Sequence, residues 1–346
     1  RKKRKKKEQM SKVLILGDTH FGIKSDSPVV YKIYDKLLKE FLFPLLKERG
    51  IKTLIHMGDL VDKRHHITGI TIDYVQNEFL NPLQSMGIET HFLVGNHDSV
   101  FKNTIKLNYV SQLVADVYPG FYVHDSIETV MIDGTSFLMV PWICKDNQDE
   151  IREKLKTSTA SVCVGHFELS GFQMYRGTVA KEGMSRKLLE DFHLVLSGHY
   201  HTKSSDEHIH YVGIPFDFTW QDWNDPKGVH ILDTKTLELE FIPSNIHLHK
   251  EIEYPFVDEL ETLKDNIVRV LVNKIDNYQE FDTFISTLEK TCASVKIVNL
   301  EENTTVEVSE EEIKVSDTLT IFKKFLNNDS LDSIINEIYT EALALK

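Results

Sequence analysis

Five short motifs in this sequence combine glycine with side chains that can bind metal ions. They read Gly17-Asp18-Thr19-His20, Gly58-Asp59-Leu60-Val61-Asp62, Gly95-Asn96-His97-Asp98, Gly165-His166 and Gly198-His199-Tyr200-His201. Carboxylate, amide and imidazole groups without any thiolate suit Mn²⁺, Fe or Zn²⁺ in a catalytic site better than a structural zinc site. Glycine lets the chain turn sharply and approach an ion closely. The residue types therefore predict a catalytic metal centre.

The spacing within the motifs suits a pair of ions. In Asp18-x-His20 and His199-x-His201, alternate residues at a strand end share a face and can turn to one ion. A carboxylate such as Asp59 can bridge two ions. Two ions about 3.5–4 Å apart activate a water molecule and neutralise charge on a phosphoryl group. Each motif alone is weak evidence, whereas the five in this order are far more specific.

The motifs follow short apolar runs that are typical of β-strands. These runs are Val13–Leu16, Thr53–Met57, Thr90–Val94, Ala160–Val164 and Leu194–Leu196. Because α/β folds place their functional sites just after strands, we expect the motif side chains to meet at the strand ends.

Helices and hairpins complete this part of the chain. Apolar residues recur at helical spacing in Val29–Lys47 and Ile70–Met86, and each segment contains one proline. Asp133-Gly134 is a turn signal between the expected strands Thr129–Ile132 and Ser136–Val140. Val229–Asp233 and Leu237–Ile242 are a second expected pair. The pattern predicts an α/β domain with two sheets and outer helices.

The sequence changes character after about Glu251. Asn266–Val272, Phe281–Thr291 and Val295–Leu300 indicate a small αβ unit. An acidic stretch and two amphipathic helices, Leu319–Leu326 and Leu331–Leu345, follow it. We therefore expect a basic extension without fixed structure at 1–9, a main domain at 10–245, a small αβ domain at 246–300, an acidic linker at 301–317 and C-terminal helices at 318–346.

Charge limits the partners that the chain can bind alone. The formal net charge is −13, although residues 1–7 are all basic. Those seven residues are either a nucleic-acid arm or nuclear address, or an extension before a natural start at Met10, and we favour the second. Since affinity for nucleic acid comes from Lys and Arg that neutralise phosphates, such contacts must be local, metal-assisted or shared with a basic partner.

Cysteine content and hydropathy exclude two classes of protein. Cys144, Cys163 and Cys292 are far apart and odd in number, which fits neither a disulfide framework nor a zinc knuckle and favours a reducing compartment. No apolar run approaches the roughly 20 residues that a membrane-spanning helix needs. We therefore expect a protein of a reducing compartment without a membrane-spanning segment.

At the five motifs the sequence resembles the calcineurin-like metallophosphoesterases. Within them it is most similar to the SbcD-type nuclease subunits of double-strand break repair complexes, in the form found in T-even-like bacteriophages. The similarity extends through Gly213-Ile214-Pro215 and Asn224–Gly228, covers residues 12–245, and continues beyond only in layout. It implies a β-sandwich flanked by helices, a small αβ capping domain and C-terminal helices.

The resemblance also implies roles for individual residues. One ion, Mn²⁺ by preference or Mg²⁺, would be held by Asp18, His20, Asp59 and His201, and a second by Asp59, Asn96, His166 and His199. His97 matches the family's catalytic histidine, which stabilises the transition state or protonates the leaving oxygen, and Asp98 would orient it. Several family members carry a further histidine where this chain has Asp62, which puts any acid–base role there in doubt.

Partners follow from the same resemblance. Family members act on DNA with an ABC-type coiled-coil ATPase, SbcC-like, in recombination, repair and replication, and they form homodimers of the nuclease subunit. This chain has no Gly-x-x-x-x-Gly-Lys-Ser/Thr loop, so any ATP use would be in trans, and the C-terminal helices are the expected dock. They could instead pack on the small domain. Lys63 and Arg64 could contact DNA phosphates or be solvated charges.

Two other functions compete with an exonuclease and endonuclease subunit. One is a phosphodiesterase or phosphatase for small substrates. Phosphatases of this fold carry Gly-Asn-His-Glu where this chain has Asp98, and Asp-Arg-Gly where it has Asp62-Lys63-Arg64. The other is a non-catalytic scaffold, yet none of the expected ligands is missing. The remaining histidines, among them His65, His66, His91, His124, His208 and His230, are interpreted as structural or surface residues.

Overall fold

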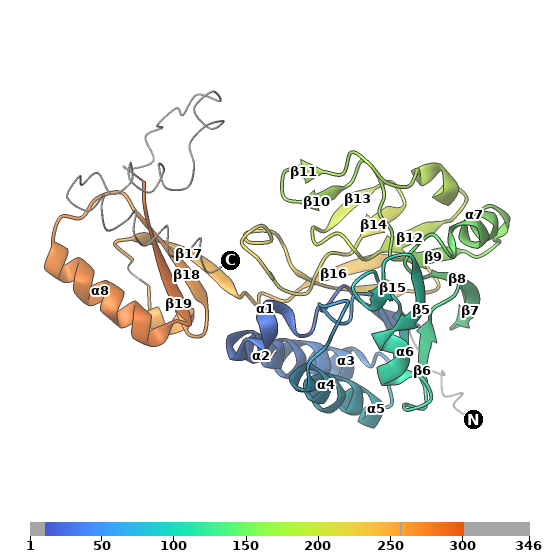
Figure 1. Cartoon of the computed structure of the whole chain (residues 1–346), viewed down its shortest axis with the longest axis horizontal. Coiled ribbons are helices and arrows are strands. Elements are labelled where there is room, and N and C mark those ends of the chain that lie inside the picture. The colour runs from blue at the N-terminus through green and yellow to red at the C-terminus, as the bar shows by residue number, and fades with distance from the viewer. Residues whose placement is uncertain (1–10, 257, 301–346) are drawn as a thin grey trace, which may run out of the picture.

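Two six-stranded sheets form the main part of the molecule. The computed structural model describes residues 11–256 and 258–300, so the expectations for residues 1–9, 301–317 and 318–346 lie outside the described residues. The first sheet has the order β16-β15-β1-β2-β3-β6 (Figure 1). Its strands are β1 (Lys12–Leu16), β2 (Thr53–His56), β3 (Glu89–Leu93), β6 (Phe121–His124), β15 (Gly228–Asp233) and β16 (Leu239–Pro243). β1, β2, β3 and β6 are parallel, and β15 is antiparallel to β1.

The second sheet has the order β13-β14-β12-β9-β8-β7. Its strands are β7 (Glu128–Ile132), β8 (Thr135–Val140), β9 (Val162–Gly165), β12 (Leu194–Ser197), β13 (Ser204–Asp206) and β14 (Ile209–Tyr211). The four central strands are parallel, and β7 and β13 are antiparallel at the two edges. The expected turn at Asp133-Gly134 joins β7 to β8, with positive φ at both residues.

The two sheets pack face to face through one apolar layer. Val13 and Ile15 of β1 share this layer with Val162 and Val164 of β9, whereas Leu14 on the opposite side of β1 joins the helical side. Side chains alternate between the two faces of a strand, so an uninterrupted apolar run can serve both layers. The expected β-sandwich flanked by helices is confirmed.

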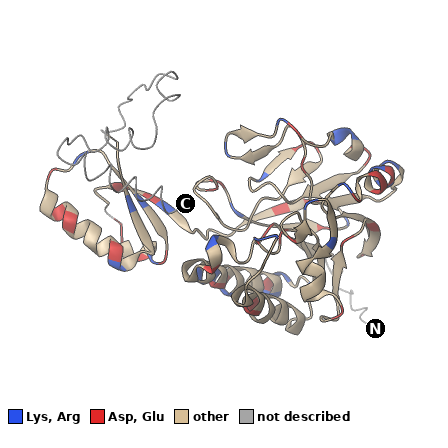
Figure 2. Ribbon diagram, in the orientation of Figure 1, with Lys and Arg blue, Asp and Glu red and all other residues tan. Residues whose placement is uncertain are grey.

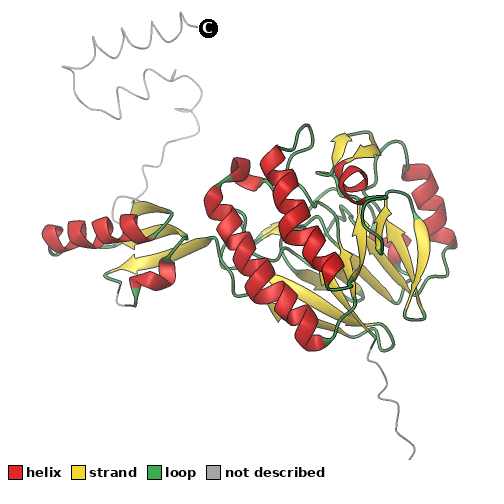
Figure 3. Cartoon of the chain, turned by 90° about the horizontal axis from the view of Figure 1, so that it is seen from below, coloured by secondary structure: helices red, strands yellow, loops and turns green. Residues whose placement is uncertain are grey.

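Two long helices cover the outer face of the first sheet (Figure 3). α2 (Pro28–Asp35) runs through a π-helical stretch, Lys36–Leu42, into α3 (Phe43–Arg49). α4 (Gly69–Tyr74) likewise runs through Val75–Leu80 into α5 (Asn81–Ser85). Each π-helical stretch comes directly before a proline-containing turn, because Pro44 and Pro82 have no N–H to donate to the carbonyl four residues earlier.

Shorter elements complete the main part. α7 (Gln148–Thr157) packs on the outer face of the second sheet through Ile151 and Leu155. The others are α1 (Ile23–Asp26), β4 (Ser99–Phe101), β5 (Thr104–Asn108), α6 (Tyr109–Val114), β10 (Gln173–Tyr175), β11 (Thr178–Val179) and the 3₁₀ helix Arg186–Leu189.

A small αβ unit projects from one side of this sandwich (Figure 1). It contains β17 (His249–Tyr254), the 3₁₀ helix Leu260–Leu263, β18 (Ile267–Val272), α8 (Tyr278–Thr291) and β19 (Ser294–Asn299). The three strands are parallel, and α8 covers them through Phe281 and Leu288. The sequence did not predict β17, because that segment has few apolar residues and no clear alternation.

Specific side-chain contacts join the unit to the main part. The guanidinium of Arg269 lies 3.9 Å from the ring centre of Trp220, which also packs on His249. His249 Nδ1 lies 2.6 Å from Asp217, and Lys32 forms an ion pair with Asp265 at 2.7 Å. Figure 2 shows acidic bands along α8, whereas basic residues are spread over many elements of the main part.

Among the described residues, no helix has the length and apolar character needed to cross a membrane.

Candidate metal centre

The five motifs meet where strands of both sheets end. β1, β2 and β3 are parallel and are followed by the first three motifs, and β9 and β12 are parallel and are followed by the other two. Carboxyl ends of parallel strands lie at the same edge of a sheet. Because the sheets face each other, the two edges bring all five motifs to one place.

The structure brings the expected ligands together in two main groups. Ligand atoms of Asp18, His20 and His201 lie within 4.8 Å of one another, as do those of Asp59, His166 and His199. Asn96 joins the second group, since its Oδ1 lies 3.0 Å from His166 Nε2. Asp59 links the groups, because its Oδ2 lies 3.7 Å from His20 Nε2 and 3.3 Å from His166 Nε2.

The backbone around these ligands takes unusual conformations. His20, Asp59 and His199 have φ values of 47°, 50° and 81°, in the left-handed region that side chains other than glycine rarely adopt. Such residues persist where surrounding structure enforces them, and they cluster at functional sites. A Cβ on Gly95 would lie 2.2 Å from Asp59 Oδ1, so glycine is required for this close approach.

The hydrogen bonds of His166 leave a place for a cation. His166 Nδ1 lies 2.8 Å from the carbonyl oxygen of Met57, which can only accept, so Nδ1 carries the proton. In the neutral ring Nε2 then directs a lone pair at Asn96 Oδ1 and Asp59 Oδ2, 3.0 and 3.3 Å away. Three acceptors that face each other repel unless a proton or a metal ion lies among them. The donor set therefore fits a divalent ion.

In the first group of ligands, the surroundings of His20 also fit a divalent ion. Its side chain is buried, and neither ring nitrogen has a hydrogen-bond partner. Leaving such polar atoms buried and unpaired costs about 1–3 kcal/mol. The carboxylates of Asp59 and Asp62 face the two nitrogens at 3.7 and 3.5 Å, which suits a ring that binds a cation between them.

A residue that the sequence analysis did not single out orients His201. Asp222 is buried, and its Oδ1 accepts a hydrogen bond from His201 Nδ1 at 3.2 Å. Its other oxygen accepts from the backbone N–H and the hydroxyl of Thr219, both at 2.9 Å. This arrangement fixes Nδ1–H on His201 and leaves Nε2 free for an ion. Asp222 lacks the glycine that marks the other motifs, so the sequence carried no signal for it.

His97 is held differently from our expectation. Its Nδ1 contacts the carbonyl oxygen of Asp62 at 2.5 Å, and its backbone N–H donates to Asp59 Oδ1 at 2.7 Å. We expected Asp98 to orient the ring of His97. Instead Asp98 accepts hydrogen bonds from the backbone N–H groups of Gly95 and Val61, at 2.8 and 3.1 Å. Asp98 therefore fixes the loop backbone, and the Asp62 carbonyl orients the ring.

Asp62 also lies closer to the centre than its departure from the family pattern suggested. Ligand atoms of His20, Asp62 and His97 form a third group within 4.8 Å of one another. The next two residues are the expected DNA contacts. Lys63 is exposed and its Nζ donates to Ser25 Oγ at 3.1 Å, while Arg64 is partly exposed.

The protonation behaviour of the centre reflects its buried negative charge. Burial raises the pKa of Asp18 well above its ordinary value. Burial would also raise the pKa of Asp59, but His166 and His20 lower it well below the ordinary range. Burial alone would lower the pKa of His166, whereas Asp59 and Asp18 raise it to about 9. The site thus favours extra positive charge, which divalent ions would supply.

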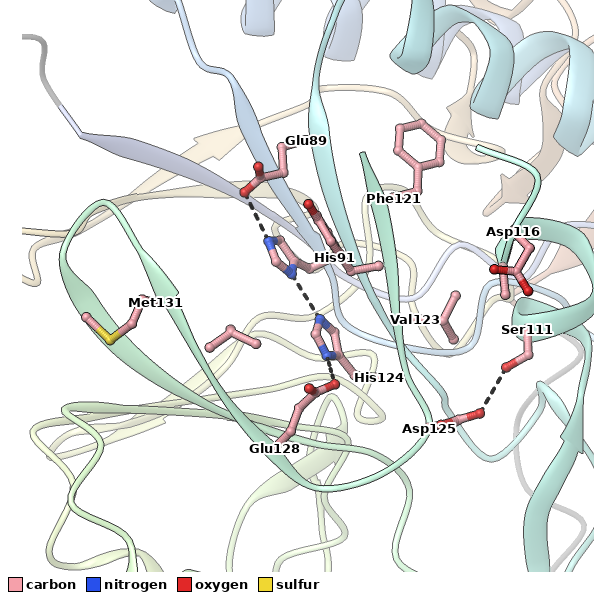
Figure 4. Close-up of a pocket in the computed structure, with 13 residues that line it drawn as sticks. Glu89, His91, Ser111, Asp116, Phe121, Val123, His124, Asp125, Glu128 and Met131 are labelled. Atoms are coloured by element: carbon pink, nitrogen blue, oxygen red, sulfur yellow. Dashed lines mark hydrogen bonds and ion pairs between the residues drawn. The ribbon is translucent and has the colours of Figure 1, made fainter. Parts of the chain in front are cut away.

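A second group of histidines and carboxylates lies between β3, β6 and β7 (Figure 4). It lines a cavity of about 570 Å³ that contains no residue of the five motifs. His91 Nδ1 and His124 Nε2 are 2.9 Å apart, and each ring also contacts a glutamate, Glu89 at 3.3 Å and Glu128 at 2.8 Å. This cavity lies away from the motifs, so its histidines and carboxylates form a group separate from the metal centre.

Comparison with known proteins agrees with this geometry. The family described as "Calcineurin-like phosphoesterase" matches residues 11–203. A relative named "Exonuclease subunit 1", from Enterobacteria phage T4, is 36% identical over 343 residues. The alignment covers 96% of this chain and 99% of that protein, so the similarity includes the small αβ unit as well as the metal centre.

Proposed function

This chain belongs to the calcineurin-like phosphoesterase family, and from that premise we propose that it is the nuclease subunit of a DNA-processing complex. The family assignment makes it a metal-dependent phosphoesterase. The observation that supports this function best is the convergence of Asp18, Asp59 and His166 with their neighbours into one buried centre. The similarity to an exonuclease subunit over nearly the whole chain favours DNA as the substrate.

The chain's own residues divide the work at this centre. Asp18, His20, Asp59, Asn96, His166, His199 and His201 would hold two divalent ions, with Mn²⁺ or Mg²⁺ the expected metals. When bound, such ions neutralise phosphoryl charge and activate water. His97 keeps its Nδ1 proton on the Asp62 carbonyl, so its Nε2 is free to exchange a proton with the reacting group.

DNA would reach the centre past Lys63 and Arg64. Both directly follow Asp62, whose carboxylate lies within the group that contains His20 and His97. Arg64 forms no ion pair within the described parts of the chain. Lys63 donates to Ser25 Oγ and lies near the carboxylate of Asp26. A guanidinium without a carboxylate partner is available to phosphates. We propose that they position the DNA backbone, and that replacing Arg64 lowers the salt dependence of binding.

A partner subunit would complete the activity. The relative is named as a subunit, and this sequence has no ATP-binding loop of its own. We propose an SbcC-like ABC-type ATPase as that partner, docked on residues 318–346, and a homodimer of the nuclease subunit, in a complex that acts in DNA recombination, repair and replication. A bacterial cytoplasm would be its place of action.

The experiment compares cleavage of end-labelled duplex DNA in Mn²⁺, in Mg²⁺ and in chelator. Wild-type protein is expected to cleave only with metal, and His97→Ala to reduce the rate by about 10²–10⁴-fold. His193→Ala, an exposed histidine outside the motifs, is the matched control and should keep the wild-type rate. Hydrolysis of a small aryl diester without DNA cleavage, even with the ATPase present, would favour a small-substrate phosphodiesterase. Failure to bind metal would favour a scaffold.

A further inference from the structure

A cavity beside the metal centre has a lining suited to a nucleobase. Its volume is about 240 Å³, and its wall includes the ligand His166, the ring of Trp142 and the side chain of Arg152. Trp142 follows β8 and Arg152 lies on α7, so neither belongs to the five motifs. The cavity therefore joins the centre to residues without an assigned role.

Trp142 lies close enough to the ligands to meet part of a bound substrate. Its ring centre is 5.1 Å from that of His199 and 6.0 Å from that of His166. The side chain is only partly buried, whereas Met139 and Val140 at the end of β8 are fully buried. A phosphate held at His166 and His199 would thus have a nucleoside substituent within reach of an available aromatic ring.

Arg152 adds a positive charge at the same cavity. It is exposed, and it forms no ion pair or hydrogen bond within the described parts of the chain. Its neighbour on α7, Lys154, is by contrast paired with Glu150 at 3.0 Å. A guanidinium with its donors free can bind a phosphate or stack on a base, whichever the bound strand presents.

The wall of the cavity also includes Gly183 and Met184. Gly183 has φ of 134°, and a Cβ there would lie 2.6 Å from the Glu168 carbonyl oxygen. Glycine is therefore required for this close approach to the backbone of residues 168–170. Met184 adds a polarisable apolar surface next to it. An indole ring that is available in such a lining can stack on a base, as aromatic side chains do in proteins that bind single strands.

We propose that this cavity, defined by Trp142, Ile143, Arg152, His166, Glu168, Gly183 and Met184 and called here the base slot, receives the base of a nucleotide next to the scissile phosphate. The inference rests on the proposed nuclease function. The base would stack on Trp142, and Arg152 would contact the adjoining phosphate. Stacking tolerates all four bases, so the slot would favour unpaired nucleotides at DNA ends without reading sequence.

The test compares two small substrates with the same leaving group, thymidine 5′-(p-nitrophenyl phosphate) and methyl p-nitrophenyl phosphate. The ratio of their kcat/KM values isolates the contribution of the nucleoside. Trp142→Ala is expected to reduce this ratio roughly tenfold or more, mainly through KM, because base stacking is lost. Trp142→Phe should keep most of the ratio, since phenylalanine still stacks. Binding of Mn²⁺, measured by calorimetry, should be unchanged in both.

Arg152→Ala provides a second test of the base slot. Because Arg152 is exposed, this substitution does not disturb the packing of the core. It should weaken binding of a labelled single-stranded oligonucleotide in chelator and lower the salt dependence of that binding. Lys156→Ala, on the same helix but outside the slot, is the matched control and should bind like wild type. Wild-type ratios in Trp142→Ala together with wild-type binding in Arg152→Ala would overturn the base slot alone. A wild-type enzyme with no preference for the nucleoside and no DNA cleavage would overturn the nuclease function as well.

Discussion

Two groups of histidines and carboxylates lie in the same sandwich, and their geometries suit different cations. At the metal centre, ligand atoms of three residues at a time converge within 4.8 Å. At the cavity in Figure 4, His91 Nδ1 and His124 Nε2 are 2.9 Å apart, with ring centres 5.2 Å apart and planes 10° apart. The distance between the ring centres is about the distance between the two nitrogens plus the radius of each ring. The two nitrogens therefore lie on the line between the ring centres and point straight at each other.

In-line nitrogens can share a proton but cannot chelate an ion. A metal needs lone pairs that converge on a third point, whereas these face one another. The chain of contacts from Glu89 through both rings to Glu128 ends at carboxylates that are half exposed. Within the described residues, every group of three potential ligands whose ligand atoms lie within 4.8 Å of one another is formed by residues of the motifs. A cluster of histidines and carboxylates therefore is not by itself a metal site. The directions of their lone pairs decide whether they can bind an ion.

Of the substitutions that test the difference between the two groups, replacement of Asp59 should have the largest effect on metal binding and activity. Asp59 reaches ligands of both groups, so Asp59→Ala is expected to abolish tight binding of divalent ions and lower phosphodiesterase activity more than about a thousandfold. Calorimetric titration with Mn²⁺ and hydrolysis of an aryl diester measure both. The control, Asp191→Ala, replaces an exposed aspartate outside the centre. Wild-type Mn²⁺ binding by Asp59→Ala would contradict the shared role.

Asp222→Asn should show a smaller effect at the same centre. The amide keeps the shape of the side chain but weakens the hydrogen bond that fixes His201. Loss of such a carboxylate partner lowers metal affinity by about 10–100-fold. Titration with Mn²⁺ measures the change, and the thermal midpoint without metal reports folding. If affinity stayed at the wild-type value while stability fell, Asp222 would be a structural residue only.

These two aspartates also show how far the sequence could predict the centre. Asp59 follows a strand and a glycine, so its type, place and neighbours were all visible in the motif. Asp222 lies 21 residues from its partner in a loop whose course depends on Trp220 packing against Arg269. No local pattern encodes that contact. The orientation of His97 was mispredicted for the same reason, since adjacency to Asp98 said nothing of the Asp62 carbonyl.

The elements of the fold also divide into those that the sequence predicted and those that it did not. Apolar runs predicted the strands and the two outer helices, because burial on both faces of a strand requires them. The π-helical stretches before Pro44 and Pro82 and the strand β17 were not predicted, since they depend on helix hydrogen bonding and on pairing with β18. His91 and His124 were interpreted as structural or surface residues. Both are buried, and their mutual contact depends on the pairing of β3 with β6.

At the second group we expect a loss of stability without loss of activity. His124→Phe removes the partner of His91 Nδ1 and leaves a buried polar atom unsatisfied. This should reduce the free energy of unfolding by about 1–3 kcal/mol. Urea denaturation of the metal-free protein measures the change, with the exposed His65→Phe as control. Weaker Mn²⁺ binding by His124→Phe would show that the second group does bind ions.

The smallest expected effect is the pH dependence that His91 adds to stability. Burial and the neighbouring His124 lower the pKa of His91 to about 3, below the ordinary value of about 6.5. The unfolded chain therefore binds a proton that the folded chain does not, so stability is present above about pH 6.5 and is lost as the pH falls toward 3. Between pH 7.5 and 5.5 His91 should contribute a loss of about 1.4 kcal/mol.

His91→Gln removes this titration. Its free energy of unfolding should fall less than that of wild type over the same interval, by about that amount. Equal losses in both proteins would show that His91 is already protonated when folded. The in-line contact with His124 would then be a shared proton between charged and neutral rings.

The most direct test of the central claim is an anomalous difference map from a crystal of the protein grown or soaked with Mn²⁺. Two peaks are expected beside Asp59, one near His20 and His201 and the other near His166 and His199, and no peak is expected between His91 and His124. A peak at the His91–His124 pair, or none beside Asp59, would contradict the central claim.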